Sequence, residues 1–108
     1  MNAKLTITPA AARAVRKRLD AATSRALHEI GKRAVVYARQ NCPVDTGELR
    51  RSIGYRVSGN KLTVGASAKH APYVEHGTGR GPPRPFLRPA ITGHMDEYKR
   101  IIRREFSR

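Results

Sequence analysis

The chain has 108 residues and a formal net charge of +14 at pH 7, from 22 Lys and Arg against 8 Asp and Glu. Its one cysteine, Cys42, excludes an intrachain disulfide and suits a reducing compartment. No apolar run approaches the roughly 20 residues of a membrane span or forms an N-terminal signal peptide. We therefore expect a soluble single domain that does not associate with membranes.

The apolar content is low for a folded domain. Val, Ile, Leu and Phe together number 21, just under one fifth of the chain. With the high charge, this share lies at the compositional edge of disorder. The apolar residues are nevertheless strongly patterned, so we expect a domain that folds but completes its burial against neighbours. The excess of cations predicts a polyanionic or acidic partner.

A long helix is predicted first. Thr8 has the character of an N-cap, and Pro9 suits the first helical position. Apolar residues then recur at helical spacing: Val15, Leu19, Ala22, Ala26, Ile30, Ala34 and Tyr37. Because the residue before a proline avoids helical geometry, Pro43 ends a helix over residues 9–41, about 50 Å long. Gly31 either admits a second backbone or weakens the middle of this helix.

A short helix and a hairpin are predicted next. Asp45 and Glu48 have the spacing of a capping box that opens one or two helical turns containing Leu49. Apolar residues then alternate with polar ones on both sides of a turn: Ile53, Tyr55, Val57, Leu62, Val64 and Ala66. This alternation predicts a β-hairpin with a three-residue loop, Ser58-Gly59-Asn60.

The last third combines a loop and a helix. Residues 71–75 are compatible with a third strand. Residues 76–85 contain three Gly and three Pro, which predicts a loop. We expect Phe86-Leu87 to return to the sheet. Helical spacing then resumes at Ile91, Met95, Tyr98, Ile102 and Phe106.

The predicted fold class is α+β, a small antiparallel sheet packed on one face by a long N-terminal and a short C-terminal helix. The single domain 1–108 would comprise the helix 9–41, the sheet and Gly/Pro loop over 45–90, and the helix 91–107.

No catalytic or metal-binding constellation stands out. The available soft ligands lack paired metal-site spacing: His28, His70, His76, His94 and Cys42. A hydrolytic site of Glu75, His76 and Arg80 is disfavoured, because adjacent residues on a strand point to opposite faces. The segment 77–82 lacks the Lys-Ser/Thr ending of a phosphate loop. We therefore predict a protein that is not an enzyme and holds no cofactor or metal.

Nucleic-acid binding is the main alternative. Eight cations follow the long helix and could track phosphates: Arg13, Arg16, Lys17, Arg18, Arg25, Lys32, Arg33 and Arg39. However, no sequence-reading motif is present, and an aromatic platform for bases is missing. A small basic protein that binds nucleic acid without sequence specificity remains open.

Three motifs in order carry a resemblance to a known family. They are the stretch Pro43–Ile53, then Tyr73, Glu75, Gly77 and Thr78, then Pro85, Phe86, Pro89 and Ala90. From about Pro9 to the C-terminus, the chain resembles the tail-component family of long-tailed bacteriophages. That family supplies neck or tail-completion proteins, located where the tail meets the head.

The resemblance implies structural rather than catalytic roles. Asp45 would cap a helix, Phe86 would anchor the loop to the core, and Glu75 would pair with an Arg or accept backbone amides. The structural motif comprises Asp45, Thr46, Gly47, Tyr73, Glu75, Gly77, Thr78, Pro85 and Pro89. The interface residues that we expect are Arg16, Arg25, Arg33, Arg80, Arg84, Phe86 and Arg88.

The resemblance also implies an assembly. Copies, six being favoured, would form a ring that completes the tail or joins it to the head and leaves a channel for DNA. Its partners would be other neck and tail proteins, with non-specific contact to phage DNA left open. The protein would reside in the virion and, during assembly, in the host cytoplasm. We expect most cations to face acidic neighbours or the outside of the ring.

Overall fold

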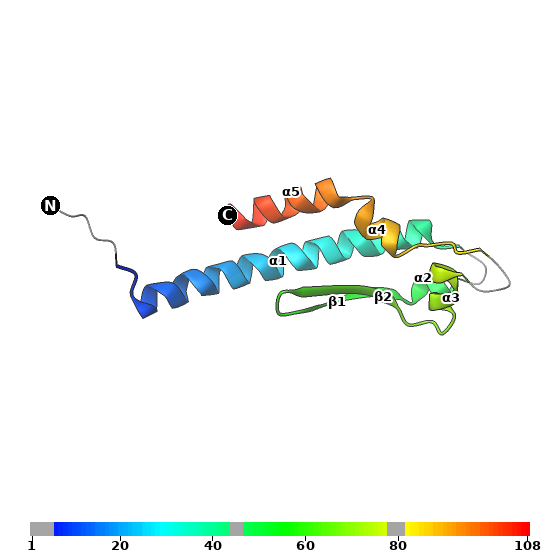
Figure 1. Ribbon diagram of the computed structural model, residues 1–108, viewed down its shortest axis with the longest axis horizontal. Coiled ribbons are helices and arrows are strands. Elements are labelled where there is room, and N and C mark those ends of the chain that lie inside the picture. Colours follow the sequence, from blue (N-terminus) through cyan, green and yellow to red (C-terminus); the bar gives the residue numbers. More distant parts are fainter. Residues whose placement is uncertain (1–5, 44–46, 78–81) are drawn as a thin grey trace.

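The computed structural model describes residues 6–43, 47–77 and 82–108. The elements in chain order are the helices α1 (Pro9–Asn41) and α2 (Glu48–Arg51), the strands β1 (Ile53–Ser58) and β2 (Lys61–Ala66), and the helices α3 (Ala71–His76), α4 (Arg88–Thr92) and α5 (Met95–Phe106). Figure 1 shows α1 as a spine, with α5 along one side, the hairpin along the other, and the short helices near its C-terminal end. The predicted α+β class is confirmed.

Helix α1 has the predicted bounds because its end signals are local. The Thr8 hydroxyl accepts a hydrogen bond from the backbone N–H of Ala11 at 3.1 Å, and Pro9 occupies the first turn. At Gly31, the Tyr55 ring from β1 lies 2.4 Å from where a Cβ would stand. Gly31 therefore admits a side chain of the hairpin, not a second backbone as we considered.

The first part of α1 extends beyond the rest of the molecule (Figure 1). Every residue from Thr6 to Ala21 is exposed, and Ala22 is the first buried position. Val15 and Leu19, which begin the predicted apolar stripe, are 56% and 49% exposed. We call residues 9–21 the α1 extension.

The hairpin is tighter than predicted. Ile53 pairs with Ala66 and Ser58 with Lys61, so only Gly59 and Asn60 lie outside the strands. The predicted length of three residues for the loop is therefore wrong, since Ser58 belongs to β1. Gly59 has a φ of 59°, which allows a two-residue turn.

Two other predictions for the sheet are also wrong. Residues 71–75 lie in α3, where Pro72 occupies the first turn and loses no helical hydrogen bond. Phe86-Leu87 precedes α4 and does not return to the sheet, which has two strands in the described ranges. The amides of Phe86 and Leu87 are bound by the Glu75 carboxylate, so they are not available to a strand.

The predicted C-terminal helix is divided in two. Ile91 belongs to α4, and Gly93-His94 separates it from α5. In α5 the buried residues are Tyr98, Ile101 and Glu105. Met95, Ile102 and Phe106 from the predicted stripe are instead 45%, 41% and 44% exposed.

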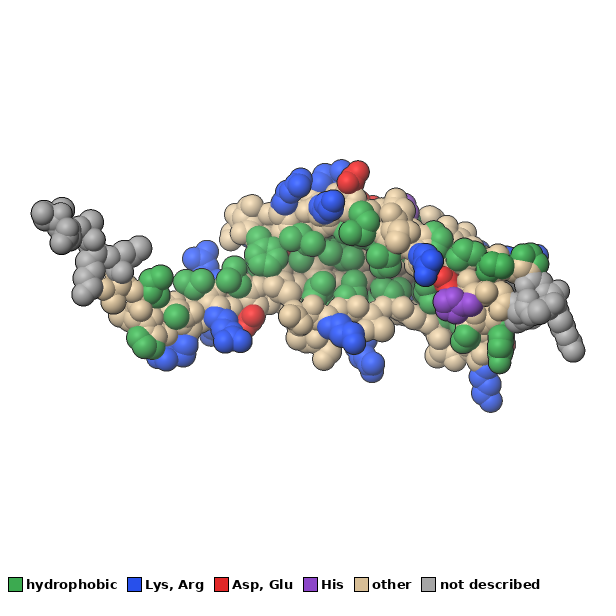
Figure 2. All heavy atoms as spheres, in the orientation of Figure 1, with side chains coloured by type: hydrophobic (Ala, Val, Ile, Leu, Met, Phe, Trp, Pro, Cys, Tyr) green, Lys and Arg blue, Asp and Glu red, His purple; other side chains and the backbone are tan. Residues whose placement is uncertain are grey.

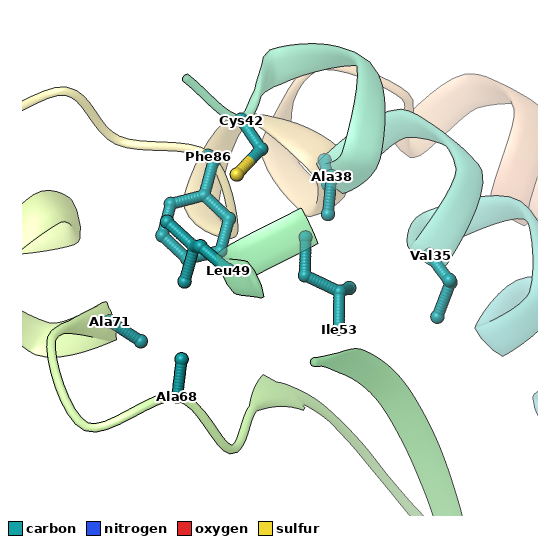
Figure 3. Packing of buried hydrophobic residues seen from close by; sticks show 9 residues of the cluster. Val35, Ala38, Cys42, Leu49, Ile53, Ala68, Ala71 and Phe86 are labelled. Carbon is teal, nitrogen blue, oxygen red and sulfur yellow. The ribbon is translucent and has the colours of Figure 1, made fainter. Parts of the chain in front are cut away.

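The buried residues form two clusters along α1. One, at its C-terminal end, centres on Phe86, which is fully buried. Figure 3 shows its ring beside Leu49 and the Cys42 sulfur, with Ile53 and Ala38 nearby. In the second cluster, Ile30 and neighbouring small residues of α1 pack against Tyr98 and Ile101 of α5.

No helix in the described ranges is long and apolar enough to cross a bilayer.

Candidate functional site

Glu75 joins the second and third sequence motifs. Its Oε1 accepts hydrogen bonds from the backbone N–H groups of Phe86 at 2.9 Å and Leu87 at 2.8 Å, and its Oε2 accepts one from Arg88 at 3.2 Å. Of the two partners that we considered for Glu75, the structure shows the backbone amides. Burial raises the pKa of this carboxyl, but the three amides and the charge of His76 outweigh it, so the pKa lies below its ordinary value.

The two sides of the Gly/Pro loop meet next to this contact. The Arg84 N–H donates to the Val74 carbonyl at 2.8 Å. Gly77 has a φ of 80°, and a Cβ there would lie 2.8 Å from the Pro83 nitrogen. The glycine is therefore required by both conformation and space. These contacts and the Glu75 hydrogen bonds direct Phe86 into the core.

The other residues of the expected structural motif differ in setting. Tyr73 is 63% exposed on α3. Pro85 is exposed and Pro89 half-buried. Gly47, with a φ of 82°, directly precedes α2. Asp45, Thr46 and Thr78 lie outside the described residues.

Helix α2 begins at Glu48 and is preceded by Gly47. The N-cap residue of the predicted capping box, Asp45, lies outside the described residues, so the capping box stays a prediction.

Two of the expected interface cations are used inside the molecule. Arg25 Nε lies 3.1 Å from Oε2 of Glu105, which is 6% exposed. The pKa of the Glu105 carboxyl is lowered by its hydrogen bond with Arg108, against the opposing effect of burial, and further by Arg25 and the nearby Arg104. Arg33 lies 3.7 Å from Glu29 and 3.8 Å from Glu97.

The remaining expected interface residues divide into exposed, buried and undescribed positions. Arg16, Arg84 and Arg88 are exposed. None of the three forms an ion pair with a carboxylate in the described part of the chain. Phe86 is fully buried, so it anchors the loop and presents no surface to a partner. Arg80 lies outside the described residues.

A cluster at the junction of α1, α4 and α5 was not predicted. The Tyr37 hydroxyl donates to Glu97, and its ring stacks on His94 with centroids 3.5 Å apart. The hydrogen bond to Glu97 is the main cause that raises the Tyr37 pKa. Burial, with the charge of Glu97, raises the pKa of Tyr98 to about 12, and its hydroxyl donates to the Ala90 carbonyl. Both phenols are thus neutral donors that tie the helices together, and neither is a base at neutral pH.

The sequence analysis did not predict the internal contacts of Glu97 and Glu105. The available signal in the sequence was the scarcity of acids. With 22 Lys and Arg against 8 Asp and Glu, a carboxylate is expected to find a cationic partner within the fold. The geometry suggested for hydrolysis is also corrected: Glu75 and His76 lie on a helix, and both Glu75 oxygens accept backbone amides. No group of three or more His, Cys, Asp or Glu side chains that could hold a metal occurs among the described residues.

The described part of the molecule also exposes apolar surface in two grooves. A groove of about 530 Å³ lies between the α1 extension and the end of α5, lined by Val15, Leu19 and Phe106 among others. A second, of about 450 Å³, lies between β2 and α5. Figure 2 shows apolar side chains gathered over this face, with Lys and Arg along its edges. Such surfaces mark sites of association.

A basic chain with exposed apolar grooves has the features of a structural assembly protein. Over residues 9–77 it matches the family described as "Bacteriophage HK97-gp10, putative tail-component". The chain belongs to this family and is a structural protein of the phage tail, a part of the virion. No curated protein and no solved structure matches it.

The matched range covers α1, α2, the hairpin and α3. It includes the first motif, and the second as far as Gly77. Thr78 and the third motif, from Pro85 to Ala90, lie beyond it.

Proposed function

We propose that the protein acts at the neck or head-proximal end of the tail, where copies form a ring that completes the tail or joins it to the head and lets DNA pass. The family supports a role in the tail. The ring is supported by the α1 extension, a helical segment whose Val15 and Leu19 are left about half exposed by the residues that the structure describes.

Covering this segment would stabilise both helix and assembly. Burying a Val or Leu side chain is worth about 1.5–3 kcal/mol, and short helices are marginal without packing. In a ring, the segment of one copy would lie on a different surface of the next, because a rotationally repeated interface is heterologous. The number of copies follows from the rotation angle, and six would match a sixfold tail tube.

The test is assembly size, measured by multi-angle light scattering and negative-stain microscopy, alone and with the neighbouring tail proteins. The double variant Val15→Glu/Leu19→Glu should remain small while keeping the helical circular dichroism of the parent chain. The control is Arg13→Gln/Lys17→Gln, which removes the same net charge of two. Residues two apart on a helix are rotated by about 200°, so the control pair lies on the opposite side. A parent chain that stays monomeric with every tail partner would refute the ring.

Nucleic-acid binding without sequence specificity is the second candidate. It is favoured by the exposure of four cations on the α1 extension: Arg13, Arg16, Lys17 and Arg18. A binder of this kind would shift DNA with a steep salt dependence while remaining small. Arg13→Gln/Lys17→Gln would then weaken DNA binding, whereas a ring protein would keep its assembled size.

A further inference from the structure

The groove between β2 and α5, which we call the α5 groove, has α1 as its floor. The lining includes Leu62, Val64, Leu87, Ile91, Met95 and Ile102. Met95 and Ile102 are nearly half exposed although their neighbour Ile101 is buried. An open apolar channel of about 450 Å³ is large enough to receive several side chains of another protein.

Exposed cations lie at or near the rim of the groove, and Asp96 is the one exposed carboxylate on α5. Lys99 follows Met95 by four residues and precedes Ile102 by three, so it lies beside both on the helix surface. Arg103 follows Lys99 by four residues, and both are exposed. Arg88, also exposed, lines the groove at α4. A complementary occupant would bring carboxylates beside its apolar side chains.

A second copy of this chain is a poor source of such carboxylates. Its carboxylates are few, and four of them are already bound within the molecule: Glu29, Glu75, Glu97 and Glu105. Each further copy would add +14 of like charge. DNA would match the rim but would leave the apolar walls uncovered, since its outer surface is phosphate and sugar.

We propose that the α5 groove receives a segment of a different tail protein, with apolar side chains on one face and Asp or Glu next to them. This inference rests on the proposed placement of the chain in the tail assembly. It assigns the groove to a foreign acidic partner and leaves the α1 extension to contacts between copies.

The first test places a photo-crosslinking amino acid at position 102 of the full chain, in tails assembled with the tail proteins of the same phage. Mass spectrometry should identify a captured peptide from another tail protein, with apolar residues flanked by Asp or Glu. Capture of a second copy or of DNA, a peptide without net negative charge, or no capture in tails that contain the chain would each overturn the proposal.

The second test uses the captured segment as a synthetic peptide, with affinity measured by fluorescence anisotropy. Lys99→Glu/Arg103→Glu should weaken binding at least about tenfold, and added salt should weaken binding to the parent chain. The control Arg13→Glu/Lys17→Glu makes the same change in net charge on the α1 extension. An equal loss of affinity in both variants would show that only total charge matters. It would refute the assignment of the α5 groove as the binding site.

The inference and the proposed function fail in different ways. Ile102→Asp alters an exposed residue of the α5 groove, so it should abolish peptide binding and leave the light-scattering size of the ring unchanged. If copies form rings but the groove captures another copy, only the inference is wrong. If purified tails lack the chain altogether, the proposed function fails and the inference with it.

Discussion

Glu75 and Gly31 show how single residues hold distant segments together. Glu75 binds backbone amides that follow it by 11 to 13 residues. Gly31 leaves room on α1 for the Tyr55 ring of the hairpin. Both contacts fix how segments far apart in the sequence are placed relative to one another.

Glu75→Gln should lower the free energy of unfolding by about 1.5–3 kcal/mol at pH 7, because hydrogen bonds to a charged acceptor are replaced by weaker ones. The folded pKa of Glu75 lies below the ordinary 4.5. Its stabilising effect is therefore complete above that value and is lost as the pH falls through the folded pKa. Urea unfolding at several pH values should show the two chains converging in acid.

The control for Glu75 is Asp20→Asn, which removes the same charge from the exposed α1 extension and should change stability little. These measurements belong in the Val15→Glu/Leu19→Glu background, where self-association does not contribute to stability. A gap between Glu75→Gln and its parent that stayed constant down to acid pH would contradict the role of the carboxylate charge.

Gly31→Ala tests the close approach of Tyr55. In an exposed helix this change would gain about 1 kcal/mol, but here the new Cβ would lie 2.4 Å from the ring. Overpacking costs about 1–3 kcal/mol, so we expect a net loss of stability in urea unfolding. Gly54→Ala, where no atom lies within 4 Å, is the control and should not be destabilising. A more stable Gly31→Ala variant would mean that the ring moves freely.

At the scale of elements, α5 presents two apolar faces to different surroundings. Tyr98 and Ile101 pack against α1, and Glu105 binds Arg25. Met95, Ile102 and Phe106 form a neighbouring stripe that is left open. The helix therefore packs internally on one face and leaves the stripe of the proposed docking groove open on another.

Adjacent isoleucines separate these two faces. Ile101 is 6% exposed and Ile102 is 41% exposed. Ile101→Ala should cost about 2–4 kcal/mol, since it removes buried methyl groups from the α1–α5 contact. Ile102→Ala should change the free energy of unfolding by less than about 0.5 kcal/mol. Thermal or urea unfolding of the two variants measures this difference. Equal losses in the free energy of unfolding would contradict the orientation of α5.

At the scale of the molecule, charge decides which contacts are favoured. Among the described residues, four carboxylates (Glu29, Glu75, Glu97 and Glu105) are bound within the molecule, while many cations remain on the surface. Any contact between copies would therefore have to overcome repulsion, whereas contacts with acidic proteins or DNA would be assisted by attraction.

Self-association should consequently strengthen as salt rises from about 0.05 to about 0.5 M, because the screening length falls well below 10 Å. Light scattering across this range measures the effect. Arg13→Gln/Lys17→Gln lowers the net charge from +14 to +12 and should show a smaller response. Assembly that dissolved steadily with added salt would instead indicate that a polyanion holds the copies together.

Local signals explain what could be predicted. Thr8, Pro9 and Pro43 act on neighbouring backbone, so the bounds of α1 were predicted correctly. The alternation from Ile53 to Ala66 specified the hairpin, although not the length of its turn. The family was also predicted correctly from short motifs.

Only the tertiary structure decided the positions of Glu75, Phe86 and α5. A short apolar run such as residues 71–75 suits a strand or a helix, and the choice depended on Pro72 and on groups far along the chain. Ile101 rather than Ile102 is buried because α5 also brings Glu105 to Arg25 of α1. Helix ends and turns depend on a few adjacent residues, whereas the buried face depends on which distant groups must satisfy one another.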